Sequence, residues 1–131
     1  MSTRARIRVL VVDHSEAMRH SLHQVVSIFT DLQWVGEVRD GESIIPQCER
    51  LCPDILLMDV GLPHVDVTQI VCEVRHAFPA MKIIGFVGFE EQILINGILK
   101  AGATVCLSKT TNIITIVEVI RRVSQSISSI S

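Results

Sequence analysis

Five short apolar runs alternate with five segments of helical periodicity along almost the whole chain. A strand followed by a helix, repeated five times, predicts a single α/β domain built on a parallel sheet. Three of the runs, 7–12, 54–58 and 82–87, are almost continuously apolar, which is typical of strands covered by helices on both faces. The expected strands lie near residues 7–12, 33–38, 54–58, 82–87 and 104–108, and the expected helices near 16–29, 43–52, 67–77, 90–100 and 113–127.

The size and charge of the chain limit what it can do. With 131 residues, 48% of them hydrophobic, it is long enough for one domain with a real core. We assign residues 1–123 to this domain and the Ser-rich residues 124–131 to a tail or the start of a linker. The net charge is −2 and the basic residues are scattered, so we expect no nucleic-acid contact by the domain itself. The apolar runs are too short to span a membrane, which predicts a cytoplasmic protein without membrane contact.

Several single residues predict where helices begin and end. Ser15 and Asn112 are placed to cap the first and last helices at their N-termini, and Gly102 to end the fourth. Pro46 lies inside the second helical segment, so this helix is expected to start late or to be kinked. His20 and His23, one turn apart on the polar face of the first helix, are interpreted as solvated rather than metal-binding.

Charged residues stand at the ends of three expected strands. Asp59 follows the run Ile-Leu-Leu-Met, Asp13 follows the run 7–12, and Lys109 follows the run 104–108. The carboxyl ends of parallel strands meet at one edge of a sheet, where ligands bind. Taken singly, Asp13 is explained as a turn cap and Lys109 as a solvated cation, but an unpaired carboxylate after four apolar residues has little structural use. The three positions together predict a functional site.

Motifs spread over most of the chain resemble a known family. In order and spacing they are similar to the receiver domain of two-component response regulators, and to the subgroup commonly joined to a helix-turn-helix DNA-binding domain. This resemblance implies a flavodoxin-like (βα)5 fold, a doubly wound parallel sheet of five strands in the order 2-1-3-4-5. The matching segments are Val11-Val-Asp-His-Ser15, Pro53-Asp-Ile-Leu-Leu-Met-Asp-Val-Gly-Leu-Pro63, Gly102-Ala103, Lys109 and Ile120-Arg-Arg-Val123.

The resemblance also implies roles for the strand-end residues. Asp59 is expected to accept a phosphoryl group from a sensor histidine kinase or a phosphotransfer protein, with Lys109 neutralising charge on the transferred oxygens. Two carboxylates on neighbouring strands need a cation between them. We expect Mg²⁺ there, held by Asp13, Asp59 and, by resemblance, the carbonyl oxygen of Gly61. The domain would thereby signal to an output, most simply transcription, rather than act as an enzyme.

Four positions depart from the receiver pattern. Receivers carry two consecutive acids at the end of the first strand. Val12 is interpreted as replacing the first of them, the outer acid, which predicts weaker Mg²⁺ binding while Asp13 remains the direct ligand. Val87 stands where receivers have a hydroxyl residue, and valine cannot hydrogen-bond a phosphoryl oxygen. Cys106 stands for the usual aromatic residue of the fifth strand, and Thr110 for a proline that aims the lysine. These changes leave open an alternative, a degenerate pseudo-receiver that acts as a phosphorylation-independent dimerisation or interaction module.

Other residues near the site are weaker candidates. His14 and His64 flank it and are interpreted as exposed loop residues, while Glu16 or Glu90 is a possible substitute for the missing acid. A phosphatase-like enzyme of the haloacid dehalogenase type also uses a strand-end aspartate. That class needs a second acid two residues later, where this chain has Gly61.

The last two helical segments hold more apolar residues than one buried stripe requires. We expect some of those in 90–100 and 113–123 to be exposed and to form a homodimer or interdomain interface. The alternative is that both helices are deeply buried.

Overall fold

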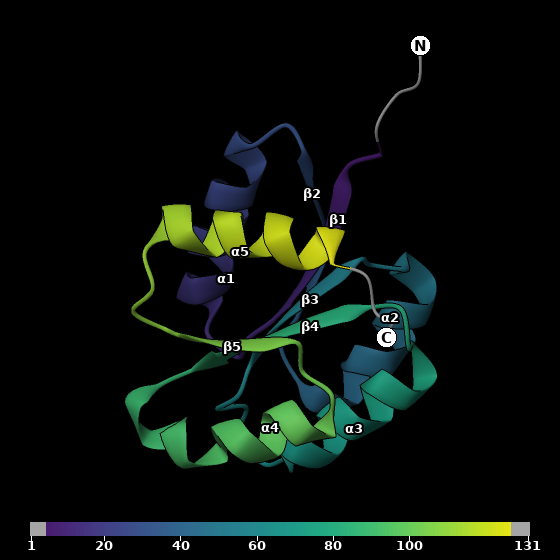
Figure 1. The fold of residues 1–131 in the computed structure, drawn as a ribbon, viewed down its shortest axis with the longest axis vertical. Coiled ribbons are helices and arrows are strands. Elements are labelled where there is room, and N and C mark those ends of the chain that lie inside the picture. The colour runs from purple at the N-terminus through teal and green to yellow at the C-terminus, as the bar shows by residue number, and fades with distance from the viewer. Residues whose placement is uncertain (1–4, 127–131) are drawn as a thin grey trace.

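A parallel sheet of five strands forms the centre of the protein (Figure 1). The structure is a computed structural model that describes residues 5–126. Its strand order, β2-β1-β3-β4-β5, confirms the predicted doubly wound topology. The strands are β1 (Ile7–Val12), β2 (Leu32–Val38), β3 (Ile55–Asp59), β4 (Lys82–Val87) and β5 (Val105–Ser108). The helices are α1 (Glu16–Ile28), α2 (Ile44–Leu51), α3 (Val67–Ala77), α4 (Ile95–Ala101) and α5 (Ile113–Gln125), with 3₁₀ turns η1 (Gly41–Ser43) and η2 (Phe89–Leu94).

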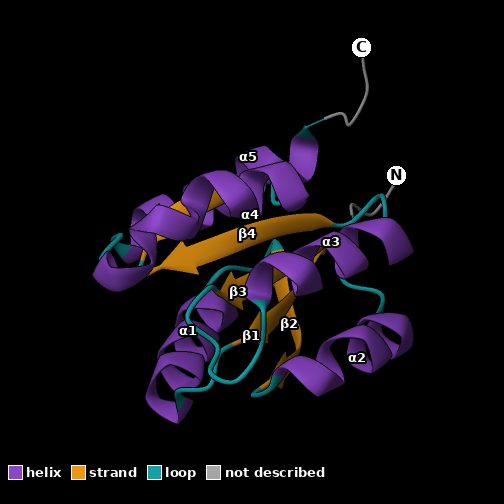
Figure 2. Ribbon diagram, turned by 90° about the horizontal axis from the view of Figure 1, so that it is seen from below, coloured by secondary structure: helices purple, strands orange, loops and turns teal. Residues whose placement is uncertain are grey.

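Helices cover both faces of the sheet, as the apolar strands predicted. Helices α1 and α5 lie on one face, and α2, α3 and α4 on the other. Figure 2 shows α1 and α2 on opposite sides of β1 and β2. Successive strand residues point to opposite faces, so β1 contributes Leu10 and Val12 to one core and Val9 and Val11 to the other. Strand β3, in the middle of the sheet, is buried along its whole length. Asp59 therefore ends the best-protected strand of the fold.

The expected helix caps are present. The backbone N–H of Met18 donates to Ser15 Oγ (3.2 Å), and that of Thr115 donates to Asn112 Oδ1 (2.9 Å). Pro46 is the third residue of α2, in the first turn, where a missing N–H costs no intrahelical hydrogen bond. Helix α5 continues to Gln125, so the expected tail begins within the helix, and residues 127–131 lie outside the described residues.

The fourth helical segment differs from the prediction. Instead of one α-helix over 90–100, a 3₁₀ turn covers Phe89–Leu94 and α4 begins only at Ile95. The cause is local: Glu91 accepts a hydrogen bond from the backbone N–H of Gly88 through Oε1 (2.9 Å), while its own N–H donates to Gly88 O (3.1 Å). A bond spanning three residues belongs to the tighter 3₁₀ geometry. The turn brings a carboxylate towards the end of β4.

An arginine ties the ends of α3 and α4 together. The guanidinium of Arg75 donates to the backbone carbonyls of Gly102 (3.1 Å), Phe78 (3.3 Å), Pro79 (2.9 Å) and Met81. Gly102 ends α4, as predicted, with a φ of 130°. A residue with a side chain rarely adopts this backbone conformation. The junction therefore depends on glycine at this position.

The single tryptophan lies on the edge strand of the sheet. Trp34, in β2, stacks on His23 of α1, with ring centroids 4.5 Å apart and an interplanar angle of 17°. His23 is exposed, as expected, but its ring also joins α1 to β2. None of the helices in the described part of the chain has the length and apolar character needed to cross a bilayer.

Candidate functional site

Two buried carboxylates lie side by side at the carboxyl edge of the sheet. Parallel pairing aligns Val12 of β1 with Met58 of β3, so the next residues, Asp13 and Asp59, are neighbours. They are 3% and 1% exposed. Backbone N–H groups orient both: Ser15 N–H donates to Asp13 Oδ1 and Gly61 N–H donates to Asp59 Oδ1, each at 2.8 Å. The edge thus presents two fixed acids close together.

Lys109 forms an ion pair with the central carboxylate. Its Nζ lies 2.7 Å from Asp59 Oδ1. The backbone places it there, because β4 pairs with β5 and Lys109 N–H donates to Val87 O (3.0 Å). Burial alone would lower the pKa of Lys109, but its hydrogen bond and ion pair with Asp59, together with nearby acids, raise that pKa above its ordinary value. Thr110, in place of the usual proline, leaves the lysine aimed at Asp59.

The buried carboxyl group of Asp13 is harder to ionise than a solvent-exposed one. Burial raises its pKa above the usual range, and the charge of Asp59 raises it further, while the Ser15 hydrogen bond and Lys109 act in the opposite direction. Burial disfavours the ionised form of a carboxyl group, whereas a bound cation favours it. The site is consequently suited to a positively charged ligand.

The sequence interpretation missed the role of His14. Its Nδ1 lies 2.9 Å from Asp59 Oδ2 and 3.8 Å from Asp13 Oδ1. The His14 side chain is 49% exposed, but it contacts the site and is not simply a solvated loop residue. The one sequence signal for this contact is that His14 directly follows Asp13. That signal is weak, because a loop side chain can turn either towards a strand end or away from it. His14 and His64 both line a hollow of about 570 Å³.

A third acid lies over the site from the 3₁₀ turn. Glu91 Oε1, bonded to Gly88 N–H, is also close to the β3 end: a Cβ placed on Gly61 would lie 3.1 Å from this oxygen and 3.3 Å from Asp59 Oδ1. Its charge contributes to the raised pKa of Lys109. Glu16 and Glu90, the expected substitutes for the missing acid, are both exposed, and neither bonds to the two buried acids among the residues described. The Gly-to-Glu spacing of three, typical of a capped turn, was the available signal.

Comparison with known families agrees with this arrangement. Residues 9–121 match the family described as the response regulator receiver domain. The chain belongs to this family. Its relatives include the response regulator GacA of Pseudomonas viridiflava, 30% identical over 89% of this chain and 55% of that protein. They also include the response regulator VraR of Staphylococcus aureus, 29% identical over 91% of this chain and 57% of that protein.

Solved receiver structures share the fold. The receiver domain of the putative response regulator NarL from Mycobacterium tuberculosis has a TM-score of 0.86 at 23% identity, covering 94% of this chain and 99% of that one. The response regulator domain of Thermotoga maritima CheB has a TM-score of 0.83 at 24% identity, covering 92% and 98%. The receiver chain spans about half the length of the curated relatives it matches.

Three of the four positions that depart from the receiver pattern carry apolar or weakly polar side chains. Val87 is buried, 3% exposed, at the end of β4, and offers no hydroxyl to the site. Val12 is 1% exposed and packs in the core on the α2 and α3 side. Burial raises the pKa of the Cys106 thiol on β5. These three side chains give the receiver no polar contact to a group bound at Asp59.

The donor set fits a divalent cation. Asp13, His14 and Asp59 each offer one ligand atom, and these atoms lie within 4.8 Å of one another. Receiver domains generally bind Mg²⁺ at such acidic pockets, and the two buried carboxylates supply the oxygen ligands that it prefers. The carbonyl oxygen of Gly61 stays a predicted ligand.

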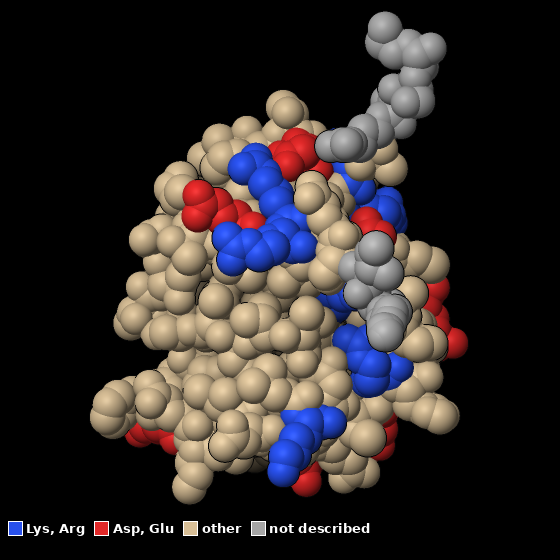
Figure 3. Space-filling model, in the orientation of Figure 1, with Lys and Arg blue, Asp and Glu red and all other residues tan. Residues whose placement is uncertain are grey.

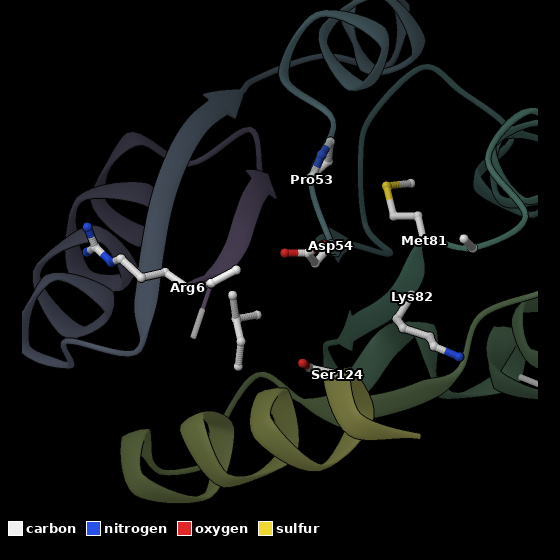
Figure 4. A pocket seen from close by; sticks show the side chains of 9 residues that line it. Arg6, Pro53, Asp54, Met81, Lys82 and Ser124 are labelled. Atoms are coloured by element: carbon white, nitrogen blue, oxygen red, sulfur yellow. The ribbon is translucent and has the colours of Figure 1, made fainter. Parts of the chain in front are cut away.

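A second hollow lies at the opposite end of the sheet. It has a volume of about 280 Å³ and is bordered by the starts of β1, β3 and β4 together with the end of α5. Its side chains, including Arg6, Asp54 and Lys82, come from the amino ends of the strands (Figure 4). Asp59 ends β3 at the other edge, so this hollow is separate from the receiver's acidic site.

Proposed function

We propose that this receiver domain accepts a phosphoryl group on Asp59 and signals through it to an output, most simply a transcriptional one. The observation that carries the proposal is the arrangement of one carboxylate, 1% exposed, with Lys109 Nζ at 2.7 Å and the Gly61 N–H at 2.8 Å. A phosphohistidine of a sensor histidine kinase or of a phosphotransfer protein would be the donor. Asp13, beside Asp59, supports the cation that such a transfer requires.

The chemistry follows from the contacts of Asp59. A carboxylate oxygen of Asp59 attacks phosphorus, an O–P bond forms, the P–N bond to the donor histidine breaks, and the imidazole leaves with its electron pair. Lys109 holds its charge beside the oxygens that carry the transferred group, and the Gly61 N–H orients the carboxylate. Mg²⁺, when bound by Asp13, Asp59 and the predicted Gly61 carbonyl, supplies neutralisation of phosphoryl charge.

The test is phosphorylation by a small donor. Wild-type protein incubated with acetyl phosphate and Mg²⁺ should gain the mass of one phosphoryl group, and the Asp59→Ala variant should gain none. The Asp40→Asn variant, changed at an exposed acid that caps η1, is the control and should react like wild type. Beryllofluoride with Mg²⁺ should produce spectral changes with the same dependence on Asp59.

The pseudo-receiver is the second candidate, and two observations favour it. Val87 offers no hydroxyl, and Glu91 already accepts from the Gly88 N–H at the rim of the site. Wild-type protein can be incubated with acetyl phosphate at high Mg²⁺, under conditions that phosphorylate a known receiver. If its mass does not change, the phosphoacceptor proposal is contradicted and the pseudo-receiver is favoured.

We also propose that the apolar face formed by η2, α4 and the start of α5 pairs with a second copy of the domain. The prediction that apolar side chains are exposed here is confirmed, and charged side chains are sparse across the middle of this face (Figure 3). Exposed apolar patches on soluble domains are commonly interaction sites. The exposed residues are Phe89 (90%), Ile93 (88%), Ile114 (59%), Ile113 (48%), Leu99 (40%) and Leu94 (39%).

Replacing one of these residues should weaken self-association. Ile93→Lys places a charge on the proposed interface, so its dimer dissociation constant should rise at least about 10-fold, because a desolvated charge costs more than 1.4 kcal/mol. Analytical ultracentrifugation over a range of concentrations measures this. Ile28→Lys, at a 72% exposed site on α1, is the matched control and should associate like wild type. A wild-type monomer at all concentrations would contradict the interface.

A further inference from the structure

His14 is the only imidazole among the groups that surround Asp59 in the described part of the chain. Each oxygen of the Asp59 carboxylate has its own partners. Oδ1 accepts from Lys109 and from the Gly61 N–H, whereas Oδ2 faces His14 Nδ1 at 2.9 Å. Asp59 Oδ2 therefore meets a nitrogen atom that also lies 3.8 Å from Asp13 Oδ1.

The separation of these atoms suits two ligands of one ion. Ligands bound at right angles, each about 2.1 Å from the metal, lie about 3.0 Å apart. The 2.9 Å between His14 Nδ1 and Asp59 Oδ2 matches this value, and the 3.8 Å to Asp13 Oδ1 fits a wider angle. Half of the histidine ring is open to solvent, so the ring can adjust without disturbing the core.

The residue at position 14, rather than the one at position 12, lies where it can contact a bound cation. The side chain of Val12 packs into the core, and an acid there would point away from Asp59. The interpretation that placed the missing acid at Val12 therefore gives way to a different one. His14 stands beside both buried carboxylates, and a ligand at this position is a neutral nitrogen instead of a charged oxygen.

We infer that His14 is the third protein ligand of the metal site and that the site selects a divalent first-row transition ion over Mg²⁺. Imidazole suits such ions, whereas Mg²⁺ prefers oxygen ligands and gains little from a nitrogen. Exchanging a carboxylate for an imidazole also removes one negative charge that would attract Mg²⁺. The inference rests on the proposed site holding a metal, but not on the phosphorylation of Asp59.

Cobalt is a suitable probe, because a histidine bound to Co²⁺ shows strongly shifted ring-proton signals in NMR. Wild-type protein titrated with Co²⁺ should give one such histidine, and His14→Ala should lose it. Isothermal titration calorimetry should show the affinity for Co²⁺ falling at least about 10-fold in His14→Ala. The affinity for Mg²⁺ should change much less. His14→Asp should reverse the preference by raising Mg²⁺ affinity.

Two variants serve as controls. His64→Asn removes a nearby imidazole, and asparagine tolerates the positive φ of 64° at that position, so its Co²⁺ signal should match wild type. Asp59→Asn should weaken Co²⁺ binding, which places the ion at this site rather than at the exposed thiols of Cys52 and Cys72. Circular dichroism confirms that each variant is folded.

The outcomes are distinct. A wild-type spectrum without a shifted histidine, or Co²⁺ binding that is equal or tighter in His14→Ala, would overturn the inference and leave His14 as a hydrogen-bond partner of Asp59 only. A bound histidine in protein that acetyl phosphate does not modify would support the metal site while contradicting the phosphoacceptor proposal.

Discussion

Replacing Lys109 by Met is expected to slow the phosphorylation of Asp59 by acetyl phosphate about 100-fold. Loss of one group that stabilises developing charge typically reduces a rate by about 10²–10³. Lys109 Nζ lies 2.7 Å from Asp59 and is the one ammonium group paired with it among the described residues. Methionine keeps an unbranched apolar stem, so packing beside β5 changes little. The variant therefore tests the effect of the lysine's charge separately from that of its packing.

Rates are measured from intact mass over time at saturating Mg²⁺. The Lys100→Met variant, changed at an exposed position near the end of α4, is the control and should react at the wild-type rate. A rate within threefold of wild type in Lys109→Met would show that the cation bound by the acids, rather than the lysine, carries the neutralisation.

Replacing Gly102 by Ala is expected to destabilise the fold by about 2–6 kcal/mol. An added Cβ would lie 2.6 Å from Arg75 Cγ and 2.7 Å from Arg75 Cβ, at a backbone φ of 130°. Such strain costs roughly 1–3 kcal/mol and overpacking a similar amount. If Arg75 moves away to relieve the contact, its hydrogen bonds to the carbonyls around the α3 and α4 ends are lost. Either response lowers the free energy of unfolding.

Urea denaturation measures this change, and the same helix offers a matched control. At Gly97 the nearest atom to an added Cβ is Thr68 Oγ1 at 3.8 Å, an ordinary contact. Gly97→Ala should therefore leave stability unchanged or raise it by up to about 1 kcal/mol through helix propensity. Equal effects of the two substitutions would show that the junction tolerates a side chain at position 102.

The strand ends were predictable because parallel pairing leaves little freedom. In the strand order that the family resemblance implies, β1 and β3 are neighbours, so Asp13 and Asp59 are expected to meet, with Lys109 at the same edge. The caps at Ser15 and Asn112 follow equally from local hydrogen bonding. These features follow from strand pairing and from side chains that bond to the backbone a few residues away.

Side chains from loops and turns were not predictable in this way. His14 follows a strand, where backbone direction is free, and its approach to Asp59 depends on the path into α1. Glu91 was assigned to an α-helix over 90–100, whereas it lies in a 3₁₀ turn that begins after Gly88, and its carboxylate accepts from the Gly88 N–H. Both groups depend on local dihedral choices that composition and periodicity do not encode.

The stack of Trp34 on His23 determines what can be learned from the intrinsic fluorescence of this protein. The sequence has one tryptophan and no tyrosine, so the emission comes from a single ring at the sheet edge, between α1 and β2. Strand β1 separates this ring from β3 and Asp59. Emission therefore reports on the packing between α1 and β2. A change of emission on metal binding would mean that binding at Asp59 alters the surroundings of Trp34 on the far side of β1.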